Sequence, residues 1–267
     1  MKLGVIGCGK MATALVKGVI DQGVVNVENV MGVARTENSR QRFSDETGAA
    51  AVSDIADVLG ASDVLLLCTK PQDIVATLAG CLFKPEEPKL LVSVAAGVTL
   101  ATLESTTPDS VRVVRCMPNT PSLVGKGATA FSLGARCVEG DLETVEKLLG
   151  AVGISVEVPE KQMDAVTGLS GSGPAYIYLI IEALADGAVR QGLPRAEALR
   201  LAAQTVSGAA EMVIRTGMHP AVLKDMVTSP GGTTITGLSV LEEKNVRSAL
   251  ISAVSAATQR AVELGKA

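Results

Sequence analysis

The residues best suited to hold a cofactor stand at the start of the chain, in the pattern Gly7-x-Gly9-x-x-Ala12. An apolar stretch, residues 3–6, precedes this pattern, and a helical stretch follows it. In such a turn Gly7 permits the tight strand-to-helix reversal, Gly9 lets the backbone approach a pyrophosphate, and the first helical amides point at phosphate groups. The pattern predicts a bound dinucleotide. An ordinary tight turn without a ligand is the alternative, and the position between a strand and a helix disfavours it.

The residues after the second expected strand, Asn29 to Ala34, indicate which dinucleotide binds. An NAD-binding protein usually has an acid here, which hydrogen-bonds the ribose hydroxyls. This chain instead has Arg35 followed by Thr36, and the planar guanidinium fork donates bidentately to phosphate. We therefore predict that Arg35 binds the 2′-phosphate of NADP, with NADPH preferred over NADH. A solvated surface arginine is the alternative.

A second glycine-rich cluster, Ser-Pro-Gly-Gly-Thr-Thr at residues 229–234, stands just before an expected helix. Pro230 and the two glycines expose consecutive amides at the helix start, and the hydroxyls of Thr233 and Thr234 add donors without charge. We predict that a small carboxylate binds here; helix capping by one of the threonines, without a ligand, is the alternative. A third cluster, residues 170–174, is interpreted as a cap with close interhelical packing.

Further candidates follow the later strands, because ligands of an open parallel sheet lie beyond the carboxyl ends of the strands. Cys68 to Pro71 follow the fourth expected strand, Ala95 to Gly97 the fifth, and Met117 to Pro121 the sixth. Small residues at these ends let the backbone reach the nicotinamide half of the cofactor. Lys70 is expected to contact a ribose or a phosphate, or else to be a surface lysine before a helix that begins with proline.

These clusters need a scaffold, and the first part of the chain alternates apolar stretches with helical ones. Near-continuous Val, Leu and Ile residues are typical of strands buried on both faces. The stretches are residues 3–6, 30–34, 49–52, 63–69, 89–95 and 112–116, with two more at 128–133 and 154–158 that extend the sheet edge. The predicted fold class is therefore α/β, with a Rossmann-like, doubly wound and mainly parallel sheet in residues 1–159.

Strand patterns end near residue 160, and helical stretches follow at 173–191, 194–216, 219–226, 234–243 and 246–264. We predict an all-α domain in residues 160–267. In its first long helix the only charged residues from 176 to 190 are Glu182, Asp186 and Arg190, spaced by four, so one thin polar stripe runs along an apolar cylinder. Such a helix must be buried nearly all round, which predicts a homodimer built by this domain. A central helix within a single bundle is the alternative.

Composition excludes several classes of protein. A length of 267 residues suits two domains. A net charge of -4 and a pI near 5.2 leave no basic field for nucleic acid. Five scattered cysteines and one histidine lack metal-ligand spacing and are typical of a reducing compartment, so we expect no metal site. With no apparent leader or membrane-spanning stretch, a cytoplasmic protein without a membrane partner is expected.

Six motifs resemble those of pyrroline-5-carboxylate reductases. They are Gly7-x-Gly9, Lys70-Pro71, Ala95 to Thr99, Asn119 to Pro121, Thr167 to Tyr176 and Ser229 to Thr234. The resemblance covers essentially the whole chain, and the last two motifs are the most specific. It implies reduction of 1-pyrroline-5-carboxylate to L-proline with NADPH or NADH, the final step of proline biosynthesis. It also implies a dimer of the helical domains, sometimes assembled further into a decamer.

The resemblance also assigns roles to individual residues. The cofactor-binding set it implies is Ile6, Gly7, Cys8, Gly9, Lys10, Met11, Arg35, Thr36, Cys68, Thr69, Lys70, Pro71, Ala95, Ala96, Gly97 and Asn119. The substrate carboxylate is expected on Ser229, Gly231, Gly232, Thr233 and Thr234. The Thr234 hydroxyl is the expected catalytic group near the ring nitrogen, with Glu160 beside the amine. Two positions depart from the family pattern: Met226 and Ser53-Asp54 stand where an asparagine is usual.

The expected chemistry is hydride transfer from the nicotinamide to the C=N carbon of a protonated cyclic imine. Positioning supplies most of the catalysis, because an iminium is already electrophilic and needs no strong general acid. Three alternatives stay open at this point. They are another NADP-dependent imine reductase or hydroxyacid dehydrogenase of similar architecture, a non-catalytic NADP-binding sensor, and a purely structural dimer without cofactor affinity.

Overall fold

The computed structural model describes residues 1–84 and 86–265, which form two compact units. The first unit comprises Met1–Ser172 together with the chain from Ala256 onward, and the second comprises Gly173–Ser255. Residues 160–172 and the end of the last helix therefore pack with the first unit, although the predicted division assigned both to the helical domain.

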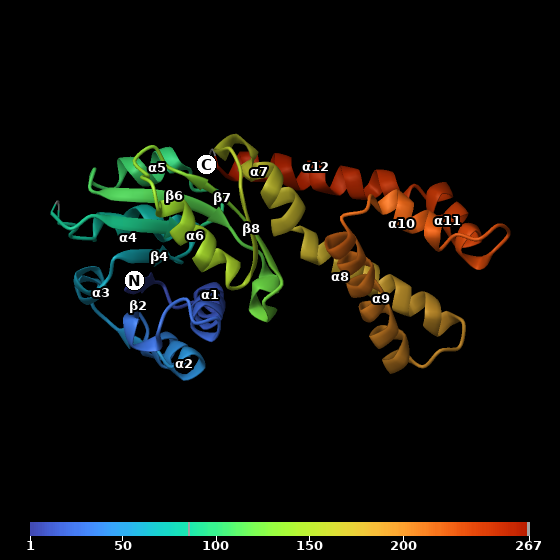
Figure 1. The fold of residues 1–267 in the computed structure, drawn as a ribbon, viewed down its shortest axis with the longest axis horizontal. Helices are drawn as coiled ribbons and strands as arrows, with labels where there is room; N and C mark the ends of the chain where they lie inside the picture. Colours follow the sequence, from blue (N-terminus) through green and yellow to red (C-terminus); the bar gives the residue numbers. More distant parts are fainter. Residues whose placement is uncertain (85, 266–267) are drawn as a thin grey trace. The chain divides into compact units, whose positions relative to one another are not determined.

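The first unit is built on an eight-stranded sheet in the order β3-β2-β1-β4-β5-β6-β7-β8 (Figure 1). Its strands are β1 (Leu3–Ile6), β2 (Val30–Val33), β3 (Ala50–Val52), β4 (Val64–Leu67), β5 (Lys89–Ser93), β6 (Val111–Met117), β7 (Gly127–Leu133) and β8 (Gly153–Glu157). Neighbouring strands are parallel except for the antiparallel pair β6 and β7. Each predicted stretch forms a strand, with shifts of a residue or two at the ends, and the predicted fold class is confirmed.

Helices cover both faces of this sheet. They are α1 (Lys10–Asp21), α2 (Glu37–Thr47), α3 (Ile55–Ala61), α4 (Ile74–Ala79), α5 (Leu100–Ser105) and α6 (Asp141–Gly150). Alternate residues of one strand enter different cores: Leu66 of β4 belongs to the core that contains Phe43 of α2 and Leu148 of α6. Leu65 belongs to the core that contains Leu78 of α4. A doubly wound sheet requires this alternation, since each strand is buried on both sides.

Short helical turns complete the first unit. The 3₁₀ turns are Val27–Asn29, Pro71–Asp73, Thr120–Val124 and Glu160–Gln162. The short helix α7 (Met163–Val166) follows the last of these turns and leads into a π-helical turn, Thr167–Gly171. A Cβ on Gly171 would lie 2.6 Å from Cε of Met117. The close packing at Gly171 is therefore against strand β6, not against another helix as the interpretation of residues 170–174 had it.

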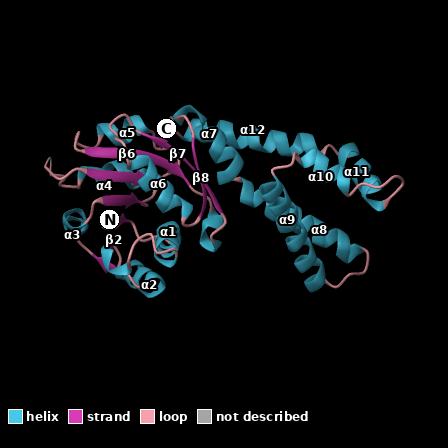
Figure 2. Ribbon diagram, in the orientation of Figure 1, coloured by secondary structure: helices cyan, strands magenta, loops and turns pink. Residues whose placement is uncertain are grey.

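In the described residues of the second unit, helices joined by loops are the only regular elements (Figure 2). Its helices are α8 (Gly173–Arg190), α9 (Arg195–Thr216), α10 (Pro220–Met226), α11 (Thr233–Glu243) and α12 (Val246–Leu264), the last of which continues beyond Ser255 into the first unit. Each predicted helical stretch is present to within a residue. α8 and α9 pack together around Ala185, Ala198 and Ala202.

The burial predicted for α8 is not reached within one chain. Its apolar residues Ile177, Tyr178 and Leu179 are 41%, 60% and 66% exposed, and Ala185 is the buried residue of the helix. The alternative of a central helix within one bundle therefore fails, since this chain alone leaves most of the apolar surface of α8 uncovered. Among the described residues, no helix has the length and apolar character needed to cross a bilayer.

Candidate functional site

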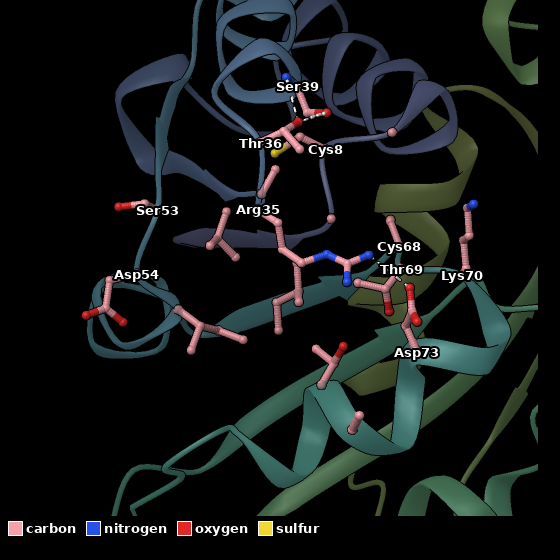
Figure 3. A pocket seen from close by; sticks show the side chains of 18 residues that line it. Cys8, Arg35, Thr36, Ser39, Ser53, Asp54, Cys68, Thr69, Lys70 and Asp73 are labelled. Atoms are coloured by element: carbon pink, nitrogen blue, oxygen red, sulfur yellow. Dashed lines mark hydrogen bonds and ion pairs between the residues drawn. The ribbon is translucent and has the colours of Figure 1, made fainter.

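A cavity of about 900 Å³ opens at the carboxyl ends of β1, β2, β3 and β4 in the first unit (Figure 3). The sheet reverses its strand order at this place, because β1 lies between β2 and β4. Open α/β sheets bind their ligands at such a switch point. The cavity also has the size of a cofactor site.

The glycine turn after β1 leaves room for a ligand. Gly7 has a φ of +99°, and a Cβ there would lie 3.0 Å from the Cys68 backbone, so this position requires glycine. A Cβ on Gly9 would meet nothing within 4 Å. Gly9 is also the N-cap of α1, where it offers no side-chain acceptor to the first helical amides. A phosphate group therefore fits against these amides.

Thr69 supplies an independent sign that the cavity is built to hold a ligand. Its hydroxyl oxygen is buried and has no hydrogen-bond partner in residues 1–84 and 86–265, and the residue lines the cavity. Buried polar atoms almost always have a partner. A donor or acceptor on a bound cofactor would satisfy this hydroxyl.

Charged side chains flank the part of the cavity that follows β2. Arg35 extends toward Asp73, with Nη2 3.2 Å from Oδ2 (Figure 3). The Arg35 side chain is 88% exposed, so it is free to change partners. Thr36 caps α2, because its hydroxyl accepts a hydrogen bond from the Ser39 backbone N–H.

Most of the predicted cofactor-binding residues line this cavity: Ile6, Gly7, Cys8, Gly9, Arg35, Thr36, Cys68, Thr69 and Lys70. Others do not line it: Lys10, Met11, Pro71, Ala95, Ala96, Gly97 and Asn119. The side-chain amide of Asn119 is engaged within the protein, donating to the Ser170 carbonyl at 3.0 Å and accepting from the Ala128 N–H at 2.9 Å. A cofactor would have to compete with these bonds to use that amide.

Sequence reasoning missed several polar residues of the cavity. Ser39, Ser53, Asp54 and Asp73 all line it. Ser53 and Asp54 directly follow β3. The resemblance places an asparagine there, which was a signal for this part of the cavity, but neither residue was predicted to bind the cofactor. Asp73 is six residues beyond the end of β4. It lies near Arg35 only because β2 and β4 both pair with β1 in the folded sheet.

The two cysteines in the cavity are not nucleophiles. Burial raises the pKa of the Cys8 thiol to about 11 and that of Cys68 to about 12. Both thiols therefore stay protonated at neutral pH, and a protonated thiol is a poor nucleophile. Within the described part of the chain, no group of three or more His, Cys, Asp or Glu residues is arranged to hold a metal ion.

Glu160 lies in the first unit, at the start of the 3₁₀ turn after β8. Its Oε1 accepts a hydrogen bond from the Leu100 backbone N–H at 2.6 Å and another from Nη1 of Arg115 at 3.0 Å. The carboxylate thus connects β6, the start of α5 and the segment after β8.

The glycine loop of the second unit has the backbone geometry of an anion site. Gly231 has a φ of +65°, and the Gly232 N–H donates to the Ser229 carbonyl at 3.1 Å. Gly232 is the N-cap of α11, so the alternative that Thr233 or Thr234 simply caps this helix is wrong. The amides of the first turn therefore lack a side-chain acceptor and favour a negative charge.

Comparisons with known proteins agree with both halves of the chain. The family described as "NADP oxidoreductase coenzyme F420-dependent" matches residues 2–97. The family described as "Pyrroline-5-carboxylate reductase dimerisation" matches residues 160–264.

Full-length relatives carry the same name. The chain is 46% identical over 265 residues to a pyrroline-5-carboxylate reductase of Methanosarcina acetivorans, covering 99% of this chain and 98% of that one. A solved pyrroline-5-carboxylate reductase from Coxiella burnetii matches with a TM-score of 0.91 and 36% identity, over 98% of both chains. A Plasmodium falciparum pyrroline carboxylate reductase with NADP bound matches with a TM-score of 0.88 and 32% identity, over 99% of this chain and 98% of that one.

Proposed function

The chain belongs to the pyrroline-5-carboxylate reductase family, and from this premise we propose which of its residues perform the reaction. The enzyme reduces 1-pyrroline-5-carboxylate to L-proline with NADPH, the final step of proline biosynthesis. NADPH, when bound, supplies the hydride. The single observation that carries the assignment of the cofactor site is the cavity at the switch point of the sheet, with the buried Thr69 hydroxyl that finds no hydrogen-bond partner among the described residues.

The cofactor is held by three sets of groups in this proposal. The turn from Gly7 to Gly9 and the first amides of α1 bind the pyrophosphate. Arg35 releases Asp73 and binds the 2′-phosphate, because a phosphate accepts two hydrogen bonds from one guanidinium. Thr69 and Lys70 contact the ribose next to the nicotinamide. The segments after β5 and β6, with Ala95 to Gly97 and Asn119, are assigned to the nicotinamide half.

The substrate carboxylate is assigned to the loop at residues 229–234. Its uncapped amides supply hydrogen bonds, and the Ser229 and Thr233 hydroxyls add donors. Thr234 orients the ring nitrogen of the imine and is the assigned catalytic group. Glu160 is assigned a place near the same nitrogen, which becomes the amine of the product. These groups bind and orient the substrate. The protein does not need to supply a strong general acid, since a protonated imine accepts hydride readily.

We further propose that the helical part of the chain, residues 160–267, forms a homodimer that can assemble into a decamer. A dimerisation domain is present, and the uncovered apolar residues of α8 and Met212 and Ile214 of α9, which are 47% and 73% exposed, support a partner surface there. The free thiols of all five cysteines support a reducing, cytoplasmic location.

The test follows NADPH oxidation by the purified enzyme with 1-pyrroline-5-carboxylate. Thr234→Ala should lower kcat/KM roughly tenfold, the size of one lost hydrogen bond of about 1.5 kcal/mol, and Thr234→Ser should restore most of it. Ser239→Ala is the matched control on α11, because the Ser239 hydroxyl donates to the Ile235 carbonyl of its own helix.

Two results would contradict the proposal. A Thr234→Ala enzyme that matches wild type in both kcat and KM would remove the assigned role of that hydroxyl. Tight NADPH binding without oxidation by any cyclic imine would instead favour a sensor.

A further inference from the structure

Three neighbouring strands carry one buried polar side chain each at the same level of the sheet. Ser93 of β5 pairs in register with Arg115 of β6, and Arg115 pairs with Ser132 of β7. Paired residues of neighbouring strands project from the same face. The three residues are 0%, 6% and 3% exposed, so each polar group needs a partner within the protein. We call Ser93, Arg115 and Ser132 the polar row.

The partners of the polar row all lie in segments that leave the sheet. The Ser93 hydroxyl accepts from the Ala95 N–H at 3.4 Å, and the Ser132 hydroxyl donates to the Val158 carbonyl at 2.6 Å. Arg115 donates to Glu160 at 3.0 Å, and its Nη2 lies 3.9 Å from Oδ1 of Asp164. The polar row therefore anchors the chain after β5 and the chain after β8 to the neighbouring strands β5, β6 and β7.

Glu160 extends this anchor to the start of α5. The oxygen that accepts from Arg115 also accepts from the Leu100 N–H at 2.6 Å, and Leu100 is the first residue of α5. The segment from Val94 to Thr99 is thus held near one end by Ser93 and just beyond its other end by Glu160. Gly97, with a φ of +77°, makes the turn between them.

The topology places this segment beside the reactive end of a bound dinucleotide. β2 and β3 lie on one side of β1, and β4, β5 and β6 lie on the other. In a doubly wound sheet the two nucleotide halves lie across the switch point, one over each set of strands. The adenosine half belongs with Arg35 after β2, so the nicotinamide half belongs over the ends of β4 to β6, next to residues 94–99.

We propose that Arg115 is a positioning residue for hydride transfer, which acts by holding Glu160 on the Leu100 amide and thereby fixing residues 94–99 against the nicotinamide. This inference rests on the proposed function. The Arg115 side chain is only 8% exposed, so it acts through Glu160 and not by contact with the reacting atoms. Fixed geometry matters here because a misplacement of about 1 Å can cost roughly 100-fold in rate.

The charges explain why a neutral residue would not serve at position 115. Glu160 is partly buried, and without the guanidinium its carboxylate would lose its nearest cation. The carboxylate would then turn toward water and release the Leu100 N–H. Residues 94–99 would lose one of their two anchors while the strands themselves remained paired.

Arg112 offers a matched control on the same strand. It forms a bidentate pair with Asp141 at the start of α6, with distances of 2.8 and 3.1 Å. Residues 112 and 115 are separated by an odd number of positions, so they project from opposite faces of β6. Arg112→Met therefore removes another ion-paired guanidinium from β6 without touching the segment at 94–99.

The experiment compares Arg115→Met, Arg115→Lys, Glu160→Gln and Arg112→Met in the full-length enzyme. The readouts are the thermal midpoint, hydrogen exchange of the peptide covering residues 94–103, NADPH affinity, kcat, KM for 1-pyrroline-5-carboxylate, and the primary isotope effect with NADPH deuterated at the transferred position. Arg115→Met should lower kcat at least about tenfold and raise the isotope effect, with KM for the imine changing less than about twofold. Exchange of residues 95–100 should become faster.

The other variants separate positioning from general damage. Arg115→Lys should recover part of kcat, because an ammonium restores the charge but not the planar fork. Glu160→Gln should lose less activity than Arg115→Met, since an amide oxygen still accepts from Leu100. Arg112→Met should lower the thermal midpoint and leave kcat and the exchange of residues 95–100 at wild-type values.

Clear results would overturn the proposal. One is a folded Arg115→Met enzyme whose kcat, isotope effect and exchange equal those of Arg112→Met. If Arg115→Met does not fold, unchanged kcat and exchange in both Arg115→Lys and Glu160→Gln would overturn it equally. A Glu160→Gln enzyme that changes only KM for the imine, with wild-type kcat and exchange, would limit Glu160 to the substrate contact proposed above and would overturn its part in anchoring residues 94–99. A wild-type protein without reductase activity would refute the proposed function, whereas the exchange comparison would still decide whether Arg115 anchors residues 94–99.

Discussion

The guanidinium of Arg35 and the carboxylate of Asp73 meet in the cofactor cavity, with Nη2 3.2 Å from Oδ2 (Figure 3). Arg35 follows β2, whereas Asp73 ends the 3₁₀ turn after β4, so the ion pair links two separate segments of the cavity wall. Exposed ion pairs contribute about 0–1 kcal/mol. Asp73 therefore acts as a weak partner that a phosphate can replace on Arg35.

Arg35→Ala should weaken the binding of NADPH far more than that of NADH. A charge-assisted hydrogen bond to phosphate is worth about 1.5–3 kcal/mol, so Kd for NADPH should rise roughly 10- to 100-fold while Kd for NADH changes by less than about threefold. Isothermal titration with both cofactors measures this. Arg42→Ala, an exposed arginine of α2 that does not line the cavity, is the control. Equal losses for the two cofactors would reject the phosphate assignment.

Asp73→Asn should have the opposite effect on the same measurement. Removing the carboxylate ends the competition for Arg35 and the repulsion of the 2′-phosphate, so NADPH should bind up to about fivefold more tightly, as expected for an exposed pair worth about 1 kcal/mol. The gain should shrink in the Arg35→Ala background, which a double-mutant cycle tests. Weaker NADPH binding in Asp73→Asn would instead make Asp73 a ribose contact.

Thr69→Val should separate stability from cofactor binding. The buried hydroxyl has no partner in the part of the chain that the structure describes, so its removal should leave the thermal midpoint of the cofactor-free enzyme unchanged or higher. Loss of one hydrogen bond to the cofactor should raise Kd for NADPH roughly 2- to 10-fold. Thr129→Val of β7 is the control, because its hydroxyl is also buried without a described partner but lies outside the cavity. Unchanged NADPH affinity in Thr69→Val would count against a cofactor contact.

Stability should fall as the solution becomes alkaline. Burial raises the pKa of the Cys8 thiol from its ordinary value of 9.0 to about 11 and that of Cys68 to about 12. The native state then binds more protons than the unfolded state above pH 9, so this stabilisation is complete below that pH and is lost as the pH rises through about 11 for Cys8 and about 12 for Cys68. Denaturant unfolding at pH 8 to 11 measures the slope. The Cys8→Ala, Cys68→Ala double variant should show a flatter dependence, and an identical slope would contradict the assignment.

Gly153→Ala should destabilise the edge of the sheet. Gly153 has a φ of +149°, and a Cβ there would lie 2.0 Å from the Gly127 carbonyl oxygen on β7, a backbone atom that cannot move aside. We expect a loss of about 3 kcal/mol in the free energy of unfolding. Gly150→Ala is the matched control, because a Cβ there meets nothing within 4 Å and the residue ends α6. Equal stability of the two variants would show that β8 shifts freely.

The sequence alone determined the elements of this protein and the position of its glycine turns. Apolar stretches of strand length and helical periodicity are local properties, so the strands and the helices of the second unit could be predicted to within a residue or two. Gly7 and Gly231 could also be identified from the sequence, because a backbone position with a positive φ favours glycine whatever the rest of the fold does.

Only the tertiary structure decided which distant side chains meet. Asp73 contacts Arg35 because the parallel strands β2 and β4 end on the same side of the sheet. Glu160 contacts Arg115 because β8, which runs antiparallel to β6, ends at the level of Ser132 and Arg115. It also decided that the Asn119 amide is hydrogen-bonded within the protein, whereas the Thr69 hydroxyl has no partner in residues 1–84 and 86–265. Such pairings depend on register and on long-range packing. No local pattern of residues contains that information, because the strand, turn or helix in which each residue lies would form equally well if its distant partner were absent.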